Sequence, residues 1–418
     1  MSSHQLQILF LDIALILLLA RGLGHLAARV QQPPVVGEIL AGVLLGPTLL
    51  NGALSDNLFP SEVRPMLVGM ANLGVVLFMF AVGLEIEQST LRGHGRLTAS
   101  TALGSTAVPF VLGVGLGLVF LNSHDTDNPT AFVVFIGLSV SVTAFPVLAR
   151  ILTDRGLSRT AVGSIALATA AVVDVVAWVA LAAVNASVGG AGSHWLVALT
   201  LPYAVFMVLV VRPLLKWFLA PGGEARTFTP WRFAVVLIGA LLSATATEAI
   251  GMHFIFGAFL FGLVVPREGA QALRADIHDR TSHLTGLLLP IYFVVAGFQV
   301  DLSGLGADGL VELSLILMVA VVGKFGGTYL GARLQKLPGR PSAALAALMN
   351  TRGLTELVIL GVGLQIGLLD NSLYSLMVVM AVVTTVMTGP LLSRVYTKPV
   401  EPDLRSADTR REDARAST

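Results

Sequence analysis

Residues 159–187 read RTAVGSIALATAAVVDVVAWVALAAVNAS, a run of 29 residues in which Asp174 is the only charge after Arg159. A helix needs about 20 mostly apolar residues to cross the hydrocarbon core of a bilayer. The run therefore predicts a membrane-spanning helix with a carboxyl group near its centre. The whole chain agrees, because 55% of its 418 residues are hydrophobic and only 12% are charged, about half the charge of a soluble protein. We expect an integral membrane protein.

The composition also excludes several classes of function. A net charge of +1 argues against the basic stripe of a nucleic-acid-binding protein. The absence of cysteine excludes disulfides, thiol catalysis and cysteine-ligated zinc. No Walker-type loop is present to bind a nucleotide, and no nucleophile–base or metal-ligand cluster emerges. We predict a protein that is not an enzyme and uses no cofactor, nucleotide or nucleic acid.

The other apolar runs predict the topology. If the N-terminus lies outside, 23 of the 26 Lys and Arg residues fall in cytoplasmic loops or the tail, and only Arg64 falls on the other side. The positive-inside rule then favours thirteen transmembrane helices with a cytoplasmic C-terminus. The thirteen runs cover residues 6–29, 34–50, 65–88, 97–121, 130–153, 159–187, 194–220, 231–249, 252–265, 283–300, 308–334, 341–367 and 372–397.

This topology predicts an all-α, multi-pass protein of the plasma membrane. Residues 1–397 form one transmembrane domain, and residues 398–418, polar and of mixed charge, are expected to be a short disordered cytoplasmic tail. Arg outnumbers Lys by 22 to 4, which favours a bacterial source.

Two ionisable residues lie near the middle of apolar runs, where each costs roughly 2.5–3.5 kcal/mol on insertion. Asp174 is interpreted as a carboxylate that alternates between a proton and a cation; the alternative is a structural carboxyl that bonds a neighbouring helix. Lys324 either balances the charge of this acidic site or fastens helices together.

Two further runs carry signs of interruption at their centres. Residues 349–359 contain Arg352 and Glu356, an i,i+4 pair, with Gly353 between them inviting a break. Residues 139–150 contain Pro146, which removes a backbone donor and is expected to push Phe145 out of helical geometry. These are the fifth and twelfth runs, an odd number apart, so they cross the membrane in opposite directions. Interrupted helices in corresponding positions of an inverted repeat mark the binding site of many secondary transporters.

Oxygen atoms at the two breaks are the predicted ligands of a dehydrated cation, together with Asp174. They comprise freed backbone carbonyls and the hydroxyls of Ser139, Ser141, Thr143 and Thr351. Glu38, on the second run, is a lower-ranked candidate that either lies on the ion path or bonds backbone groups.

Five segments resemble those of monovalent cation/proton antiporters of the second cation–proton antiporter family, especially plant-type cation/H⁺ exchangers and their bacterial relatives. The resemblance extends to about residue 397. It implies a sodium/proton antiporter-like fold of thirteen helices with inverted repeats and two crossed discontinuous helices. It also implies a core domain that moves as an elevator against a dimerisation domain, a homodimer, and K⁺ or Na⁺ exchanging for protons at Asp174. The segments are Gln32–Pro47, Ser139–Leu152, Asp174–Trp178, Pro290–Asp301 and Met349–Leu360.

One position departs from the family pattern. Electrogenic relatives carry a second acid before the aspartate and others carry Asn or Gln, whereas this chain has Val173. Valine cannot hold a second proton or bond Lys324, so we expect one-for-one, electroneutral exchange. The alternatives to a cation/proton antiporter are a sodium-coupled symporter of an organic anion, and a channel-like cation efflux protein or sensor.

Overall fold

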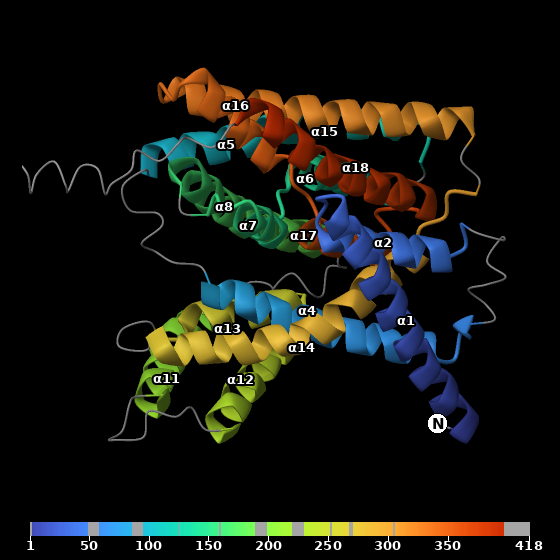
Figure 1. The fold of residues 1–418 in the computed structure, drawn as a ribbon, viewed down its shortest axis with the longest axis vertical. Helices are drawn as coiled ribbons and strands as arrows, with labels where there is room; N and C mark the ends of the chain where they lie inside the picture. Colours follow the sequence, from blue (N-terminus) through green and yellow to red (C-terminus); the bar gives the residue numbers. More distant parts are fainter. Residues whose placement is uncertain are drawn as a thin grey trace, which may run out of the picture.

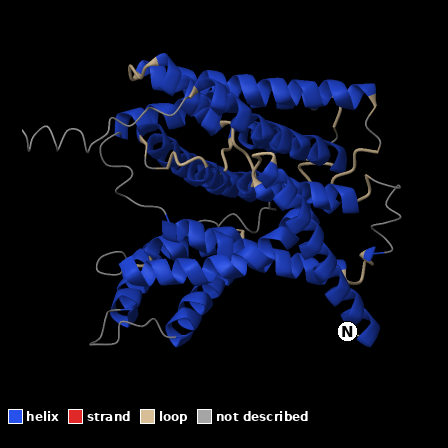
Figure 2. Cartoon of the chain, in the orientation of Figure 1, coloured by secondary structure: helices blue, strands red, loops and turns tan. Residues whose placement is uncertain are grey.

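The computed structural model describes residues 2–48, 58–85, 95–124, 126–158, 160–188, 199–219, 230–250, 253–266, 271–303 and 306–396. Within these residues every regular element is helical (Figure 2). The helices are α1 (Ser3–Arg29), α2 (Pro34–Leu45), α4 (Arg64–Glu85), α5 (Gly95–Phe120), α6 (Pro129–Ser141), α7 (Phe145–Asp154), α8 (Ala161–Val188), α10 (Thr200–Phe206), α11 (Arg212–Leu219), α12 (Pro230–Ala249), α13 (Phe254–Val264), α14 (Gln271–Phe298), α15 (Ala307–Leu334), α16 (Gly339–Met349), α17 (Leu354–Gln365) and α18 (Asn371–Val395), with a π-helical turn, η3 (Met207–Val211), between α10 and α11.

The helices confirm an all-α membrane protein. In the described part of the chain ten spans are long and apolar enough to cross a bilayer, and the bent pair α16 and α17 makes an eleventh. The apolar helices α2 and α13 lie at the second and ninth predicted runs, but with 12 and 11 residues they are shorter than a simple span. The count of thirteen crossings therefore stays a prediction. The predicted tail, residues 398–418, lies outside the described residues.

One helix is longer than its apolar run. The tenth run was predicted over residues 283–300, whereas α14 begins at Gln271. Its first turns contain Arg274, Asp276 and Arg280, side chains that a search for apolar residues leaves out. Hydrophobicity predicts where a helix enters the bilayer, but helix propensity lets the same helix continue into water.

The helices form two groups, which Figure 1 shows one above the other. The upper group consists of α5–α8 and α15–α18, and the lower group contains α4 and α11–α14. Helix α2 packs on α1 and α14. The tightest contact in the upper group joins α5 and α15, where a Cβ atom on Gly327 would lie 2.1 Å from the Gly104 carbonyl oxygen. This close approach brings Lys324 of α15 against the backbone of α5.

A histidine ties three helices of the upper group together. His124 follows α5, Glu312 lies on α15, and Asp370 is the N-cap residue of α18. His124 Nδ1 lies 2.6 Å from Asp370 Oδ2, and His124 Nε2 lies 3.4 Å from Glu312 Oε2. The hydrogen bond to Asp370 raises the pKa of His124, the carboxylate charges adding to it, and the same bond lowers the pKa of Asp370.

We expect this cluster to stabilise the protein most in mildly acidic solution. Because folding raises the pKa of His124, its protonated form contributes stability to the folded protein. This contribution is complete below the unfolded pKa of about 6.5 and is lost as the pH rises through the folded pKa. The lowered pKa of Asp370 contributes stability above about 3.9, so both are present near pH 5–6. His124→Asn should cost about 1 kcal/mol there, and less once the pH rises past the folded pKa of His124. Melting temperatures in detergent test this, with the exposed His25→Asn as control; a loss that does not vary with pH would contradict it.

Candidate functional site

The fifth and twelfth predicted runs are both broken, and their breaks lie against each other. Helix α6 ends at Ser141 and α7 begins at Phe145, while α16 ends at Met349 and α17 begins at Leu354. The axes of α16 and α17 are bent by 43°. The Ala144 N–H donates to the Thr351 carbonyl oxygen at 3.1 Å, so a backbone hydrogen bond joins the two unwound segments.

The local sequence explains both breaks, with one correction. Phe145 was expected to leave helical geometry, but it is the first residue of α7 and the irregular residues are 142–144. The reason is that Pro146 fits the first turn of a new helix and disrupts the turn before it. Gly353 ends the second break with φ +157°, where a Cβ atom would lie 2.5 Å from Val147 Cγ2. Only glycine lets α17 begin so close to α7.

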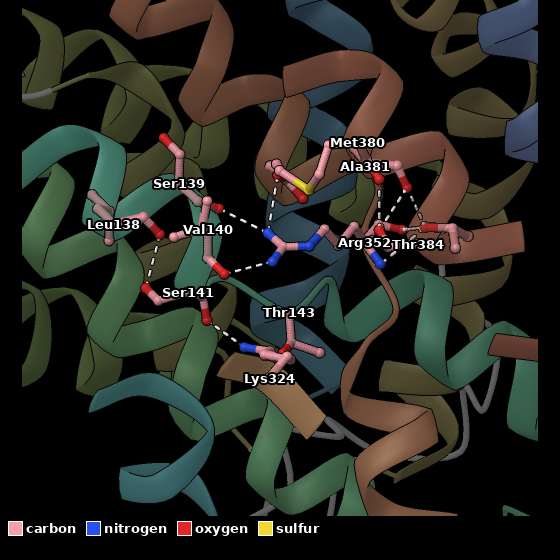
Figure 3. Close-up of polar contacts among 12 residues, drawn as sticks. Leu138, Ser139, Val140, Ser141, Thr143, Lys324, Arg352, Met380, Ala381 and Thr384 are labelled. Atoms are coloured by element: carbon pink, nitrogen blue, oxygen red, sulfur yellow. Dashed lines mark hydrogen bonds and ion pairs between the residues drawn. The ribbon is translucent and has the colours of Figure 1, made fainter. Parts of the chain in front are cut away.

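Positive side chains cap the carboxyl end of α6 (Figure 3). Arg352 donates to the carbonyl oxygens of Ser139, at 2.8 Å from Nη1, and of Val140 from Nη2. Lys324 Nζ donates to the Ser141 carbonyl and, at 3.0 Å, to that of Ser105 on α5. The last carbonyls of a helix have no partner within it and carry its negative dipole end. Two cations therefore satisfy groups that lipid cannot satisfy.

Arg352 also pairs with Glu356 inside the protein. Arg352 Nη1 lies 3.0 Å from Glu356 Oε1, and both side chains have no exposed surface. The pair brings two charges together at the start of α17, next to the capped end of α6. Lys324 does not join this ion pair; its hydrogen bonds go to the carbonyls of Ser105 and Ser141.

Asp174 lies where two half-helices begin. Asp174 is 2% exposed, on α8, and its carboxyl group lies close to the backbone N–H of Phe145 at the start of α7. Thr355 Oγ1, in the first turn of α17, lies 3.5 Å from Asp174 Oδ2, and Oδ1 has no partner among the described residues. The N-termini of helices are positive ends that favour an anion. The carboxylate is thus held between two positive helix ends with one oxygen unused.

Three of the four predicted hydroxyl ligands donate to backbone carbonyls. Ser141 Oγ donates to Leu138 O at 2.8 Å, Thr143 Oγ1 to Met349 O at 3.0 Å and Thr351 Oγ1 to Leu348 O at 2.7 Å. Ser139 Oγ is buried and has no hydrogen-bond partner among the described residues. Each hydroxyl oxygen keeps acceptor capacity.

Sequence reasoning missed two threonines. Thr355 Oγ1 lies 3.5 Å from Asp174 Oδ2, and Thr385 of α18 accepts from the Arg352 N–H at 3.0 Å and donates to the Arg352 carbonyl at 2.8 Å. Thr385 belongs to a group with Thr384 and Thr388 in an otherwise apolar run, a signal that was available. Thr355 lies one residue before Glu356, and no local pattern distinguishes its hydroxyl from those of the neighbouring threonines.

Two cavities approach the site from opposite ends. A cavity of about 520 Å³ is lined by Glu38, Arg150 of α7 and Leu354 at the start of α17, beside loops predicted to be cytoplasmic. At the other end, a cavity of about 60 Å³ is lined by His253 and Gln365. The described residues contain no group of three or more His, Asp or Glu side chains able to hold a metal ion.

Comparison with known proteins identifies the relatives of this chain. The family described as "Sodium/hydrogen exchanger, transmembrane" matches residues 13–398. The chain is 38% identical to Na(+)/H(+) antiporter NhaS4 of Synechocystis, over 96% of this chain and all of that protein. It is also 38% identical to Cation/H(+) antiporter 20 of Arabidopsis thaliana, over 93% of this chain, and 34% identical to K(+)/H(+) antiporter 1 of Saccharomyces cerevisiae, also over 93%. It spans about half the length of these last two, 48% and 46%.

A solved structure shares the fold. The sodium proton antiporter MjNhaP1 of Methanocaldococcus jannaschii superposes with a TM-score of 0.69 over 93% of this chain and 96% of that one. The two sequences are 16% identical, so this likeness concerns the fold alone.

Proposed function

We propose that this chain, which belongs to the sodium/hydrogen exchanger family, exchanges a monovalent cation, K⁺ or Na⁺, for protons. It is a multi-pass membrane protein of a transporter family and not an enzyme. The observation that carries the proposal is the buried Asp174 carboxylate, which lies between two positive helix ends and has one oxygen without a partner. In such a site a proton and a cation compete for the same negative charge.

The predicted stoichiometry is one for one. Asp174 carries a single negative charge, so it is neutralised equally by one proton or one cation. Val173 beside it is buried and apolar, and Lys324 is held by two backbone carbonyls. With Asp174 as the titrating group of the exchange step, each cycle moves one positive charge in each direction.

Oxygen atoms around Asp174 would replace part of the water shell of the cation. Thr355 Oγ1 is the nearest neutral oxygen, and the hydroxyls of Thr143 and Thr351 line the same breaks. Lys324, Arg352 and Glu356 serve to hold the broken helices in place and to balance charge, not to bind the transported ion.

Alternating access follows from the unequal cavities. The site is approached by about 520 Å³ at the end we assign to the cytoplasm and by about 60 Å³ at the other, which supports an inward-facing conformation. We propose that the upper group moves as an elevator against the lower group, within a homodimer of thirteen-span, inverted-repeat subunits. The N-terminus would lie outside and the C-terminus in the cytoplasm.

Everted vesicles from cells that lack their own antiporters test the exchange. An acid interior is established, and a pH-sensitive dye follows proton release on addition of K⁺, Na⁺ or Li⁺. We expect release by at least one of these ions, and no sustained current in solid-supported membrane recordings. A current proportional to transport would refute the one-for-one stoichiometry. No release with any ion between pH 6 and 9 would refute antiport and favour an organic-anion symporter or a channel-like protein.

A further inference from the structure

Glu38 is a buried acid whose carboxylate lies in a cavity wall. Its side chain is 8% exposed and lies in the wall of the 520 Å³ cavity. Among the residues that the structure describes, no hydrogen bond or ion pair joins another group to its carboxylate. A buried carboxylate is costly unless something compensates its charge. The space that the carboxylate faces is the cavity that leads toward the broken helices.

Helix α2 holds Glu38 rigidly opposite those helices. A Cβ atom on Gly37 would lie 2.2 Å from the Leu23 carbonyl oxygen of α1, and one on Gly42 would lie 2.4 Å from the Val294 carbonyl oxygen of α14. These contacts seat α2 against α1 and α14. Across the cavity lie Pro146 of α7 and Leu354 of α17, each within two residues of a group that bonds Asp174.

The charged side chains that line the cavity indicate what the negative charge of Glu38 contributes there. Arg21 and Arg150 also line the wall, and their positive charges act on Glu38. Glu38 is the only acidic side chain among the described residues of the lining, where His278 is the remaining ionisable group. Without Glu38 the cavity would present two arginines and no negative charge to an entering cation, which would lower the local cation concentration.

We propose that Glu38 is a second cation-binding carboxylate, an entry site that holds the monovalent cation between cytoplasmic water and Asp174. This inference rests on the proposed antiport. The cation at Glu38 remains partly hydrated by the cavity, and it loses further water only at the broken helices. Because the negative charge acts on any monovalent cation, Glu38 supplies local concentration and not selectivity between K⁺ and Na⁺.

The test compares the two faces of the membrane. In everted vesicles, where the cytoplasmic face is outside, Glu38→Gln should raise the half-saturating cation concentration about five- to tenfold. In vesicles of the opposite orientation it should change little. Glu38→Asp, which keeps the charge, should stay close to wild type, and the exposed Asp279→Asn of α14 is the matched control. An unchanged cytoplasmic value for Glu38→Gln, an equal change at both faces, or a loss shared by Glu38→Asp would overturn the proposal.

A measurement on the wild-type protein covers the case in which Glu38→Gln does not fold. Impermeant choline chloride screens charges in a water-filled cavity. It should raise the half-saturating cation concentration at the cytoplasmic face and leave the other face unchanged. Equal sensitivity at both faces would overturn the entry site. Failure of the antiport proposal itself is distinct, because the wild-type protein would then release no protons at all.

Discussion

Asp174→Asn is expected to reduce cation-driven proton release at least about 100-fold, to the background of vesicles without the protein. The amide keeps the size of the carboxyl group but binds neither a proton nor a cation in exchange. Asp174 is the carboxyl group that lies 3.5 Å from Thr355 Oγ1, in the first turn of α17. The dye assay in everted vesicles measures the loss, with Asp174→Glu as the matched variant that should retain measurable exchange.

The same substitution should make the protein more stable. Asp174 is 2% exposed and has one oxygen without a described partner, so removing its charge removes a desolvation cost. We expect a higher melting temperature in detergent for Asp174→Asn than for wild type. Loss of transport together with a gain in stability distinguishes a functional carboxylate from a structural one. Retained exchange, or a large fall in melting temperature, would contradict this assignment.

Arg352→Gln is expected to have the largest effect on stability, about 3–5 kcal/mol. It leaves Glu356, which has no exposed surface, as an unpaired buried charge. It also removes the donors to the Ser139 and Val140 carbonyls at the end of α6. Melting temperature and the yield of monodisperse protein in detergent measure the loss.

The partner of Arg352 supplies the control. Glu356→Gln should cost less than Arg352→Gln, because the guanidinium keeps its two carbonyl acceptors. The double variant should be more stable than Arg352→Gln alone, since it leaves no unpaired carboxylate at this position. If the two single variants lost the same stability, the capping of α6 by Arg352 would contribute nothing beyond the ion pair.

Much of this architecture could be predicted from local sequence. The length of an apolar run indicates a span wherever lipid is the solvent, which is why ten or eleven candidate spans coincide with predicted runs. The interruption of two runs was equally local, because Pro146 and Gly353 act on their own backbone. The position of Asp174 near the middle of a span follows from the run that surrounds it.

Only the tertiary structure decided which groups meet. Lys324 was expected to balance Asp174 or to fasten helices, and its hydrogen bonds go to backbone carbonyls of α5 and α6. Thr355, which is not one of the four predicted hydroxyls, bonds Asp174, and Glu38 faces a cavity that no local sequence pattern predicts. The physical reason is that lipid makes nearly every face of these helices apolar, so periodicity does not tell which face packs inward. The partners of each buried charge are therefore set by helix rotation and close approach, which exist only in the folded bundle.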